Sequence, residues 1–539
     1  MEHAGYLGRV VDWIRRRFGE LKSPAALARR RRSRCVDFFA ETLEVRLTPA
    51  ALTLADVETV IAQAVTRASE ISPNSIVAVT DREGFVLGVW DVNGGAPPTA
   101  GEIAIAVSKA GTATYLSSNQ HAFSSRTAGF IVQQNFPPGV RNKPPGPLVG
   151  VNFSNLDFSD INKFKGPGSI VLFSNQPGLG IVPVPGTSLY GSPGGVPLYK
   201  DGELVGSVGV TGDGTENLQV RQRHDTDERV ALGAQIGFAP DKEFRGSRVF
   251  IDGIRLPLVK GRGRLEIVAP FGSIGSPVAP YTLIASPAPF AYPTATLGGV
   301  MGEVRQPISD DPLLFDLDPN NDTINGQMRL TAAEVESILA LAAERAGITR
   351  GGIRLPRGQA AQVFITVVSN PDAPGVAPTV LGTFRTPDAT MFSWDVAVQK
   401  ARTAVFFSSP LAAPYLPDEL EGLAFSTRTV GFLAQSLYPP GIAGTQPGPL
   451  NGLQTTLSTS PADPNLPNGF TIFPGGFGLY RNGVLIGAIG VSGDGVDQDD
   501  IIGAAGTVNF LAPDSIRADF FSFQGARLPY AKFPRNPTL

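Results

Sequence analysis

The chain has 539 residues, of which 42% are apolar and 17% charged, so it can bury a sizeable core and is not a wholly disordered protein. Its single cysteine, Cys35, excludes an intrachain disulfide and a thiolate-rich metal site. The net charge of −3 combines nine arginines and one lysine in residues 1–34 with an acidic remainder, which predicts no nucleic-acid binding by the body of the chain.

Residues 1–50 are interpreted as a basic leader. No run of about 18 uncharged apolar residues occurs in the chain, which predicts no transmembrane span, and the acidic residues of Val36–Ala50 argue against an ordinary secretory signal. The segment LEVRLTPA (Leu43–Ala50) resembles a short N-terminal sorting segment on planctomycete proteins assigned as exported. This resemblance implies an exported, cell-surface or periplasmic protein. A disordered basic tail on a cytoplasmic protein is the alternative.

The first folded segment opens with a helix. Thr53 and Asp56 have the spacing of a capping box, which predicts the helix start. Apolar residues then recur at the helical spacing expected of a core-facing stripe: Val57, Val60, Ile61, Ala64, Val65 and Ala68. The β-branched segment Ser75–Asp81 predicts a strand that continues as a hairpin, and Ala104–Leu116 predicts a second helix.

A hairpin and a third helix follow a loop-rich middle. Within Leu198–Gly214, the pair Asp201-Gly202 predicts a two-residue turn, because a type I′ turn needs positive φ at both positions. The second strand of this hairpin has glycine at every third position, which predicts close backbone approach or β-bulges rather than a phosphate cradle. The last helix is expected near Asp227, and the segment ends at Gly253–Pro257.

The same series recurs in the second half of the chain. AFSSRTAGF (Ala122–Phe130) returns as AFSTRTVGF (Ala424–Phe432), with seven of nine residues identical, and Leu198–Gly214 returns as Leu479–Gly495 with ten of 17 identical. The second copy is predicted to contain a helix from Thr331 with Glu334 at capping-box spacing, a strand at Gln362–Val368, a helix at Trp394–Phe407, a turn at Asn482-Gly483 and a helix near Asp499. The chain is therefore a duplicated domain.

Four segments follow from this repeat. They are the leader (1–50), a first domain (51–258), a proline-rich linker without a counterpart in the repeat (259–328) and a second domain (329–535). The linker is expected to be ordered and to pack on the domains.

An ordered set of motifs links both copies to one family. In the first copy the matching residues are Asp81, Gly84, Lys109, Ala110, Thr112, Ala113, Gly194, Gly195, Asp201, Gly202, Gly206, Gly209 and Gly212. In the second they are Lys400, Ala401, Thr403, Ala404, Gly475, Gly476, Gly483, Gly487, Gly490 and Gly493. This series resembles the GlcG/HbpS family of heme-binding proteins. The resemblance implies two tandem α+β domains, each an antiparallel sheet flanked by helices, that bind heme and often assemble into oligomers.

Histidine is the feature in which this chain departs from the family pattern. Heme binding in the family is discussed around a histidine or a hydroxyl ligand, yet the chain has only His3, His121 and His224, and the second copy has none. The resemblance implies that the first copy uses His121 or the hydroxyl of Thr112. The second copy offers only Thr403, a weaker iron ligand, so its heme affinity is expected to be lower or absent.

Two pairs of residues at equivalent positions are candidates for carboxylate binding. Lys109 and Thr112, and likewise Lys400 and Thr403, lie three residues apart and share a helix face. Each pair offers an ammonium and a hydroxyl to a carboxylate such as a heme propionate. A surface lysine beside an ordinary helix threonine is the alternative.

Arginine and histidine complete the candidate site. Arg126 and Arg428, in the repeated FSxRTxGF motif, are suited to clamp a second carboxylate, or alternatively to bind a loop carbonyl or an internal acid. His121 follows Asn119 and Gln120, so it is expected to be partly exposed, and it is the one candidate metal ligand retained.

Three functions of different classes remain open at this stage. The first is an exported or surface-associated protein that binds heme, to scavenge or sense it. The second is a non-catalytic structural or interaction module that kept the fold without the ligand. The third is an enzyme acting on a small organic acid anchored by Lys109 or Lys400, for which no acid or base is identified. The duplication also predicts that the two copies pair with each other as a homodimer would, with further homo-oligomer formation possible.

Overall fold

A computed structural model describes residues 51–532, apart from 134, 141–142, 144–145, 150–172, 177–179, 185–186, 217–223, 260, 262, 264, 266, 287–291, 307–321, 355–356, 458–462 and 468. The leader, including the LEVRLTPA segment, lies outside the described residues, as do His3 and Cys35.

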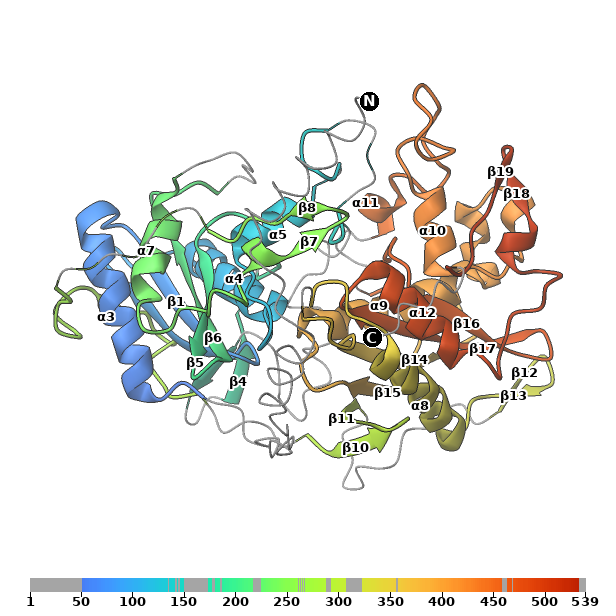
Figure 1. Ribbon diagram of the computed structural model, residues 1–539, viewed down its shortest axis with the longest axis horizontal. Helices are drawn as coiled ribbons and strands as arrows, with labels where there is room; N and C mark the ends of the chain where they lie inside the picture. The colour runs from blue at the N-terminus through green and yellow to red at the C-terminus, as the bar shows by residue number, and fades with distance from the viewer. Residues whose placement is uncertain are drawn as a thin grey trace, which may run out of the picture. The chain divides into compact units, whose positions relative to one another are not determined.

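A helix at Ser125–Ile131 lies where the sequence predicted a loop-rich segment. The helices and strands of the first repeat otherwise include the predicted ones, in the predicted order (Figure 1). They are α3 (Leu54–Ile71), β1 (Ile76–Asp81), β2 (Val86–Asp91), α4 (Ala100–Leu116), α5 (Ser125–Ile131), β3 (Phe173–Gln176), β4 (Gly180–Pro183), β5 (Gly195–Lys200), β6 (Glu203–Thr211), α7 (Thr226–Ala234), η2 (Gly246–Arg248), β7 (Phe250–Ile251) and β8 (Ile254–Arg255).

The second repeat follows the same plan after a segment with short strands of its own. That segment holds β9 (Ser276–Pro277), β10 (Thr294–Leu297), β11 (Val300–Gln306), β12 (Thr323–Ile324) and β13 (Gln327–Met328). The repeat holds α8 (Ala332–Ile348), β14 (Val363–Ser369), β15 (Val380–Arg385), α9 (Phe392–Phe407), η3 (Pro410–Tyr415), η4 (Asp418–Leu420), α10 (Thr427–Leu433), α11 (Leu453–Leu457), β16 (Gly476–Arg481), β17 (Val484–Gly493), α12 (Val496–Gly506), η5 (Ala518–Phe520), β18 (Ser522–Phe523) and β19 (Ala526–Arg527).

Each repeat is built around a sheet whose central strands are antiparallel. The first sheet has the order β4-β3-β2-β1-β6-β5, with β9 added to β2, and the second has the order β10-β11-β15-β14-β17-β16. The hairpin β10–β11, which precedes the second repeat in the chain, thus extends the second sheet through β15. Mixed helix and sheet content in both repeats confirms the predicted tandem α+β fold.

Helices cover both faces of each sheet. In β1, Val77 and Val79 pack in a cluster with α3 and α7, whereas Ile76 and Ala78 pack in a cluster with α4. In Figure 1, α3 and α7 lie together against the first sheet. Because successive strand residues point to opposite faces, a strand between two helical layers is buried on both faces, as all six residues of β1 are.

Local signals placed the element boundaries correctly where the stabilising group lies nearby in the chain. Thr53 and Thr331 both form the predicted capping boxes. Asp201 and Asn482 have φ of 52° and 48°, and the glycine after each also has positive φ, as the predicted turns require. The largest differences lie at two helix starts: α4 begins at Ala100, four residues before the predicted Ala104, and α12 begins at Val496, three residues before the predicted Asp499.

The glycines of the last strand have the predicted packing role. A Cβ at Gly209 would lie 2.1 Å from the carbonyl oxygen of Ala106, and one at Gly490 would lie 2.0 Å from that of Ala397. The central helix of each repeat therefore packs directly on the strand backbone.

Two apolar clusters contain residues of both repeats. One includes Leu116 of α4 and Phe407 of α9, which are equivalent positions of the two copies. The other includes the equivalent pair Val107 and Val398. Polar contacts also cross between the copies, since the guanidinium of Arg305, next to the second repeat, donates to both carboxylate oxygens of Glu83 at 3.1 and 3.2 Å.

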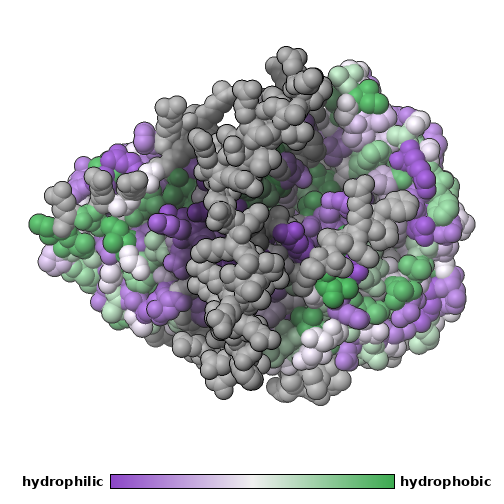
Figure 2. All heavy atoms as spheres, viewed as in Figure 1, coloured by the Kyte–Doolittle hydropathy of each residue, from purple (hydrophilic) through white to green (hydrophobic). Residues whose placement is uncertain are grey.

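The surface seen in Figure 2 mixes hydrophilic and hydrophobic residues in small patches on both repeats. Within the part of the chain that the structure describes, no helix combines the length and apolar character needed to cross a bilayer.

Candidate functional site

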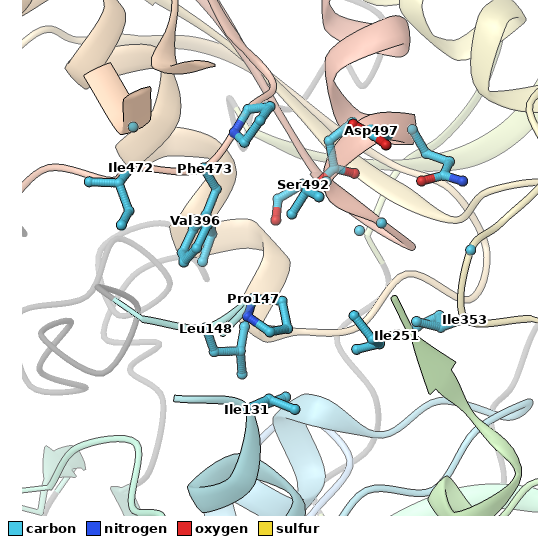
Figure 3. Close-up of a pocket in the computed structure, with 18 of the residues that line it drawn as sticks. Ile131, Pro147, Leu148, Ile251, Ile353, Val396, Ile472, Phe473, Ser492 and Asp497 are labelled. Carbon is cyan, nitrogen blue, oxygen red and sulfur yellow. The ribbon is translucent and has the colours of Figure 1, made fainter. Parts of the chain in front are cut away.

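A cavity of about 630 Å³ is lined by residues of both repeats. Figure 3 shows Ile131 and Leu148 of the first repeat on one side, facing Val396 and Phe473 of the second on the other. Volumes of this order are typical of sites that enclose a small organic ligand or cofactor.

Apolar side chains make up most of the cavity wall, and a few polar groups converge on it. The apolar members include Leu116, Phe123, Ile131, Leu148, Phe250, Ile353, Phe392, Val396, Phe432, Ile472 and Phe473. The polar members include His121, Lys400, Arg428, Ser492, Asp497 and Asp499.

His121 is buried, with 1% of its surface exposed, so the prediction of partial exposure is wrong. The polar groups of the loop around it form hydrogen bonds with other parts of the protein. The hydroxyl of Tyr199 donates to the carbonyl oxygens of Ser118 and His121, and Asn119 donates its N–H to Asp388 of the second repeat. Polar neighbours therefore hold this loop inside the protein instead of exposing it to water.

The imidazole of His121 is held at one nitrogen only. Its Nδ1 lies 3.0 Å from the hydroxyl oxygen of Ser118, while its buried Nε2 has no hydrogen-bond partner among the described residues. Burial, together with the nearby positive charge of Arg354, lowers the pKa of His121 to about 3. The ring is consequently neutral near pH 7.

Lys400 lies on the second-repeat side of the cavity. Its Nζ donates to the carbonyl oxygen of Val491 at 2.7 Å and to Oδ2 of Asp499 at 2.8 Å. Burial lowers the pKa of Lys400 and raises the pKa of Asp499 to about 6. The second carboxylate oxygen of Asp499, Oδ1, is buried and has no partner in the described structure.

Lys109, at the equivalent position of the first repeat, has a fuller set of partners. Its Nζ donates to the carbonyl oxygen of Val210 at 2.9 Å, to Oδ2 of Asp227 at 2.8 Å and to Oε1 of Glu216 at 2.9 Å. Burial raises the pKa of Asp227 to about 6. The ammonium group of Lys109 is therefore occupied by groups of its own domain.

The two candidate threonines are occupied by the backbone. Thr112 accepts a hydrogen bond from the N–H of Tyr190 at 2.7 Å. Thr403 donates to the carbonyl oxygen of Gln399 and accepts from the N–H of Thr471. Neither hydroxyl is among the groups that line the large cavity.

Both candidate arginines bind internal acids, which was one of the two predicted alternatives. Arg126 holds Glu228 through Nε and Nη2, at 2.6 and 2.8 Å, with both side chains buried. Arg428 donates to Asp500 at 2.8 Å and to Asp497 at 2.9 Å, and it also lines the cavity with 23% of its side chain exposed.

A smaller cavity of about 270 Å³ belongs to the first repeat. Ser192, Tyr190 and Glu216 line it, and it shares Leu116 and Leu148 with the large cavity. Ser192 and Glu216 were not singled out from the sequence, and neither was Ser492. The available signal was the alignment of the two copies, which places Ser492 opposite Thr211.

Both repeats match the same sequence family. A sequence model described as "Haem degrading protein HbpS-like" matches residues 52–220 and 357–507, which together make up more than half of the chain. The chain belongs to the HbpS-like family. The two separate matches confirm that the family domain is present in two tandem copies.

Individual relatives of this HbpS-like chain cover parts of it. A segment of 152 residues is 32% identical to the corrinoid adenosyltransferase PduO of Salmonella typhimurium, and it covers 28% of this chain and 33% of PduO. The chain thus spans about a third of that relative. Among solved structures, a PduOC:heme complex is 26% identical with a TM-score of 0.22, covering 34% of this chain and 99% of that one. A double mutant of Streptomyces reticuli HbpS is 20% identical with a TM-score of 0.22, covering 38% and 95%.

No cluster of three or more His, Cys, Asp or Glu side chains with metal-binding geometry is found in the described parts of this HbpS-like chain. A metal that arrives within an organic ligand needs fewer protein ligands, because a porphyrin supplies four of them. A single neutral imidazole such as His121 is then sufficient on the protein side.

Proposed function

We propose that this protein binds one heme in the cavity between the two repeats. Membership of a family described as haem degrading makes heme the first ligand to consider. The cavity of about 630 Å³ and its wall of aromatic and aliphatic side chains suit a flat, largely apolar macrocycle. Bound heme would supply a redox-active iron centre.

The observation that carries the proposal is the buried imidazole of His121. A histidine binds iron in its neutral form, and the pKa of about 3 keeps this ring neutral at any physiological pH. When Ser118 accepts from a protonated Nδ1, the lone pair of Nε2 is left for a ligand, and Nε2 is the nitrogen without a partner. His121 of the first copy would then hold the iron of a bound heme, in a cavity that the second copy largely encloses.

A hemin titration of the full chain, followed by Soret absorbance, tests this assignment. We expect a saturable, shifted Soret band in the wild-type protein and a loss of at least tenfold in affinity, with a changed band position, in His121→Ala. His224→Ala is the matched control, because His224 is exposed and does not line the cavity. A titration with no shift relative to free hemin would leave the ligand-free structural module as the better description.

We also propose that the two copies pair inside one chain through equivalent surfaces. Support comes from the apolar clusters that combine Leu116 with Phe407 and Val107 with Val398. Small-angle scattering of the full chain should give the dimensions of one compact particle for residues 51–532. Scattering from two separated bodies joined by a linker would contradict the pairing.

An exported or surface-associated location, with heme scavenging or sensing as the role, completes the proposal. It rests on the sequence of the leader, in particular LEVRLTPA. Fractionation of the native host, with mass spectrometry of the N-terminal peptide, would locate the protein. Intact leader peptide found only in the cytoplasm would contradict export.

A further inference from the structure

The first repeat carries an internal carboxylate on its buried lysine. Glu216 accepts hydrogen bonds from Nζ of Lys109 at 2.9 Å, from the hydroxyl of Thr211 at 2.6 Å and from the hydroxyl of Ser192 at 2.9 Å. Burial acts to raise the pKa of Glu216, but Lys109 and the hydroxyls outweigh it, so the pKa is lowered and the group is a carboxylate. Three donors thus converge on one anionic group.

The second repeat keeps these donors but lacks the internal carboxylate. Lys400 occupies the position of Lys109, and Ser492 occupies that of Thr211. In the described structure no second carboxylate binds Lys400: Asp497 lies in the first turn of α12, two residues before Asp499, and it binds Arg428 and Lys532 instead.

Hydrogen-bond donors on the cavity wall of the second repeat are therefore not all used. The ammonium of Lys400 can donate three hydrogen bonds, and two of them are accounted for, by Val491 and Asp499. The hydroxyl of Ser492 makes no hydrogen bond to any described residue, although the residue is 3% exposed. Both side chains line the large cavity, and Figure 3 shows Ser492 beside Asp497 there.

We infer that Lys400 and Ser492 bind a carboxylate of the ligand, at the place that the Glu216 carboxylate takes in the first repeat. In the first repeat the side chain of Glu216 already occupies this place, so a ligand carboxylate cannot bind there. The chain then has one carboxylate site and not two. This inference rests on the proposed function to the extent that the carboxylate is a heme propionate. It assigns the carboxylate site to the second copy, although Lys109 and Lys400 occupy equivalent positions of the two sequences.

The chemistry of the site explains why an acid is favoured over a neutral ligand. Hydrogen bonds from an ammonium to a carboxylate are stronger than neutral ones, and they gain strength where water is excluded. Lys400 has a side-chain exposure of 2%, so an incoming carboxylate would meet it in a nearly dry environment. The apolar wall formed by residues such as Phe473 would receive the body of the ligand.

Protoporphyrin IX and its dimethyl ester provide the test, because neither contains iron and only the former carries free propionates. Fluorescence titration of the full chain should show the acid binding at least tenfold more tightly than the ester. Ser492→Ala should reduce that preference three- to tenfold, and Lys400→Met should abolish it. Ser492→Ala keeps the test decisive if Lys400→Met fails to fold, since the Ser492 hydroxyl supports no described contact. Thr211→Ala is the matched control in the first repeat and should leave the preference unchanged.

Equal affinity for acid and ester, a preference that Ser492→Ala leaves unaltered, or no porphyrin binding at all would overturn the assignment. Acid-selective binding without the His121-dependent Soret shift would instead refute only the iron ligation, so the two proposals fail separately.

The closure of the first repeat has its own test in Glu216→Ala. Removal of this side chain leaves Lys109 with Val210 and Asp227 alone, the same two kinds of partner that Lys400 has. In ¹⁹F NMR with 4-fluorobenzoate, we expect one bound resonance in the wild-type protein and a second one in this variant. A single unchanged resonance in Glu216→Ala would refute the closure of the first repeat by Glu216.

Discussion

Replacement of Lys109 by methionine distinguishes a structural lysine from a ligand-binding one. The side chains of Lys109 and Asp227 are both 0% exposed, and their ion pair measures 2.8 Å. Methionine fills most of the volume but removes the charge, so the carboxylate of Asp227 is left buried without its counter-charge. Breaking a buried pair in this way costs about 3–5 kcal/mol. We therefore expect Lys109→Met to lower the free energy of unfolding at pH 7 by that amount.

Urea unfolding followed by circular dichroism measures this loss, and two further variants make the result specific. In the double variant Lys109→Met/Asp227→Asn, the buried charge is gone while the amide oxygen can still accept the N–H of Gly214, which now donates to Asp227 at 2.9 Å. About 2 kcal/mol should return. The control Lys200→Met breaks a half-exposed pair with Asp56, also 2.8 Å long, and should cost under about 1 kcal/mol.

The reasoning is refuted if Lys109→Met unfolds within about 1 kcal/mol of the wild-type protein, or if the added Asp227→Asn change makes it less stable. Either result would mean that Lys109 does not hold Asp227 in place. Lys109 would then be available to a ligand, as the sequence alone had suggested.

Three further predictions follow from other features of the fold. Gly490→Ala should cost about 1–3 kcal/mol in urea unfolding, because its Cβ would lie 2.0 Å from the carbonyl oxygen of Ala397. Gly101→Ala, in helix α4, is the control: the nearest atom to its Cβ would lie 3.9 Å away, so this change should be neutral or stabilising. The pKa of Asp227 is raised from 3.8 to about 6, so its contribution to stability is full below about pH 4 and is lost as the pH rises through 6. Relative to Asp227→Asn, the free energy of unfolding of the wild-type protein should fall by about 3 kcal/mol between pH 4 and pH 7. A difference between the two proteins that does not change with pH would contradict this. Arg305→Met leaves Glu83 without the bidentate guanidinium contact, so it should lower the urea concentration at the unfolding midpoint and expand the particle in small-angle scattering. If neither the midpoint nor the dimensions change, Arg305 does not hold the two repeats together.

The sequence alone was sufficient wherever the stabilising contact lies within a few residues of the chain. The capping boxes at Thr53 and Thr331 join residues three apart, and the Asp201-Gly202 turn depends on two adjacent φ angles. The glycine spacing likewise predicted close backbone approach in the last strand, as Gly209 and its neighbour Ala106 bear out. The duplication and the family followed from the repeated motifs, because these motifs encode the turns and close contacts of the domain.

The candidate site could be predicted only in part, because its residues meet across large sequence distances. The sequence placed Lys109 and Lys400 at equivalent positions, as candidates for binding a carboxylate or as surface lysines. It could not show that Glu216 reaches Lys109 while Asp497 turns to Arg428 instead.

Tertiary structure also decided the position of His121. Polar neighbours in the sequence predicted exposure, since a polar loop normally lies at the surface. The hydroxyl of Tyr199 and the carboxylate of Asp388 satisfy that loop from other parts of the fold, and the ring lies in a cavity with Lys400 of the other copy. Sequence determines which hydrogen-bonding groups a segment carries, but only the folded chain determines whether protein or water satisfies them, and that choice fixes burial, charge and the chemistry available.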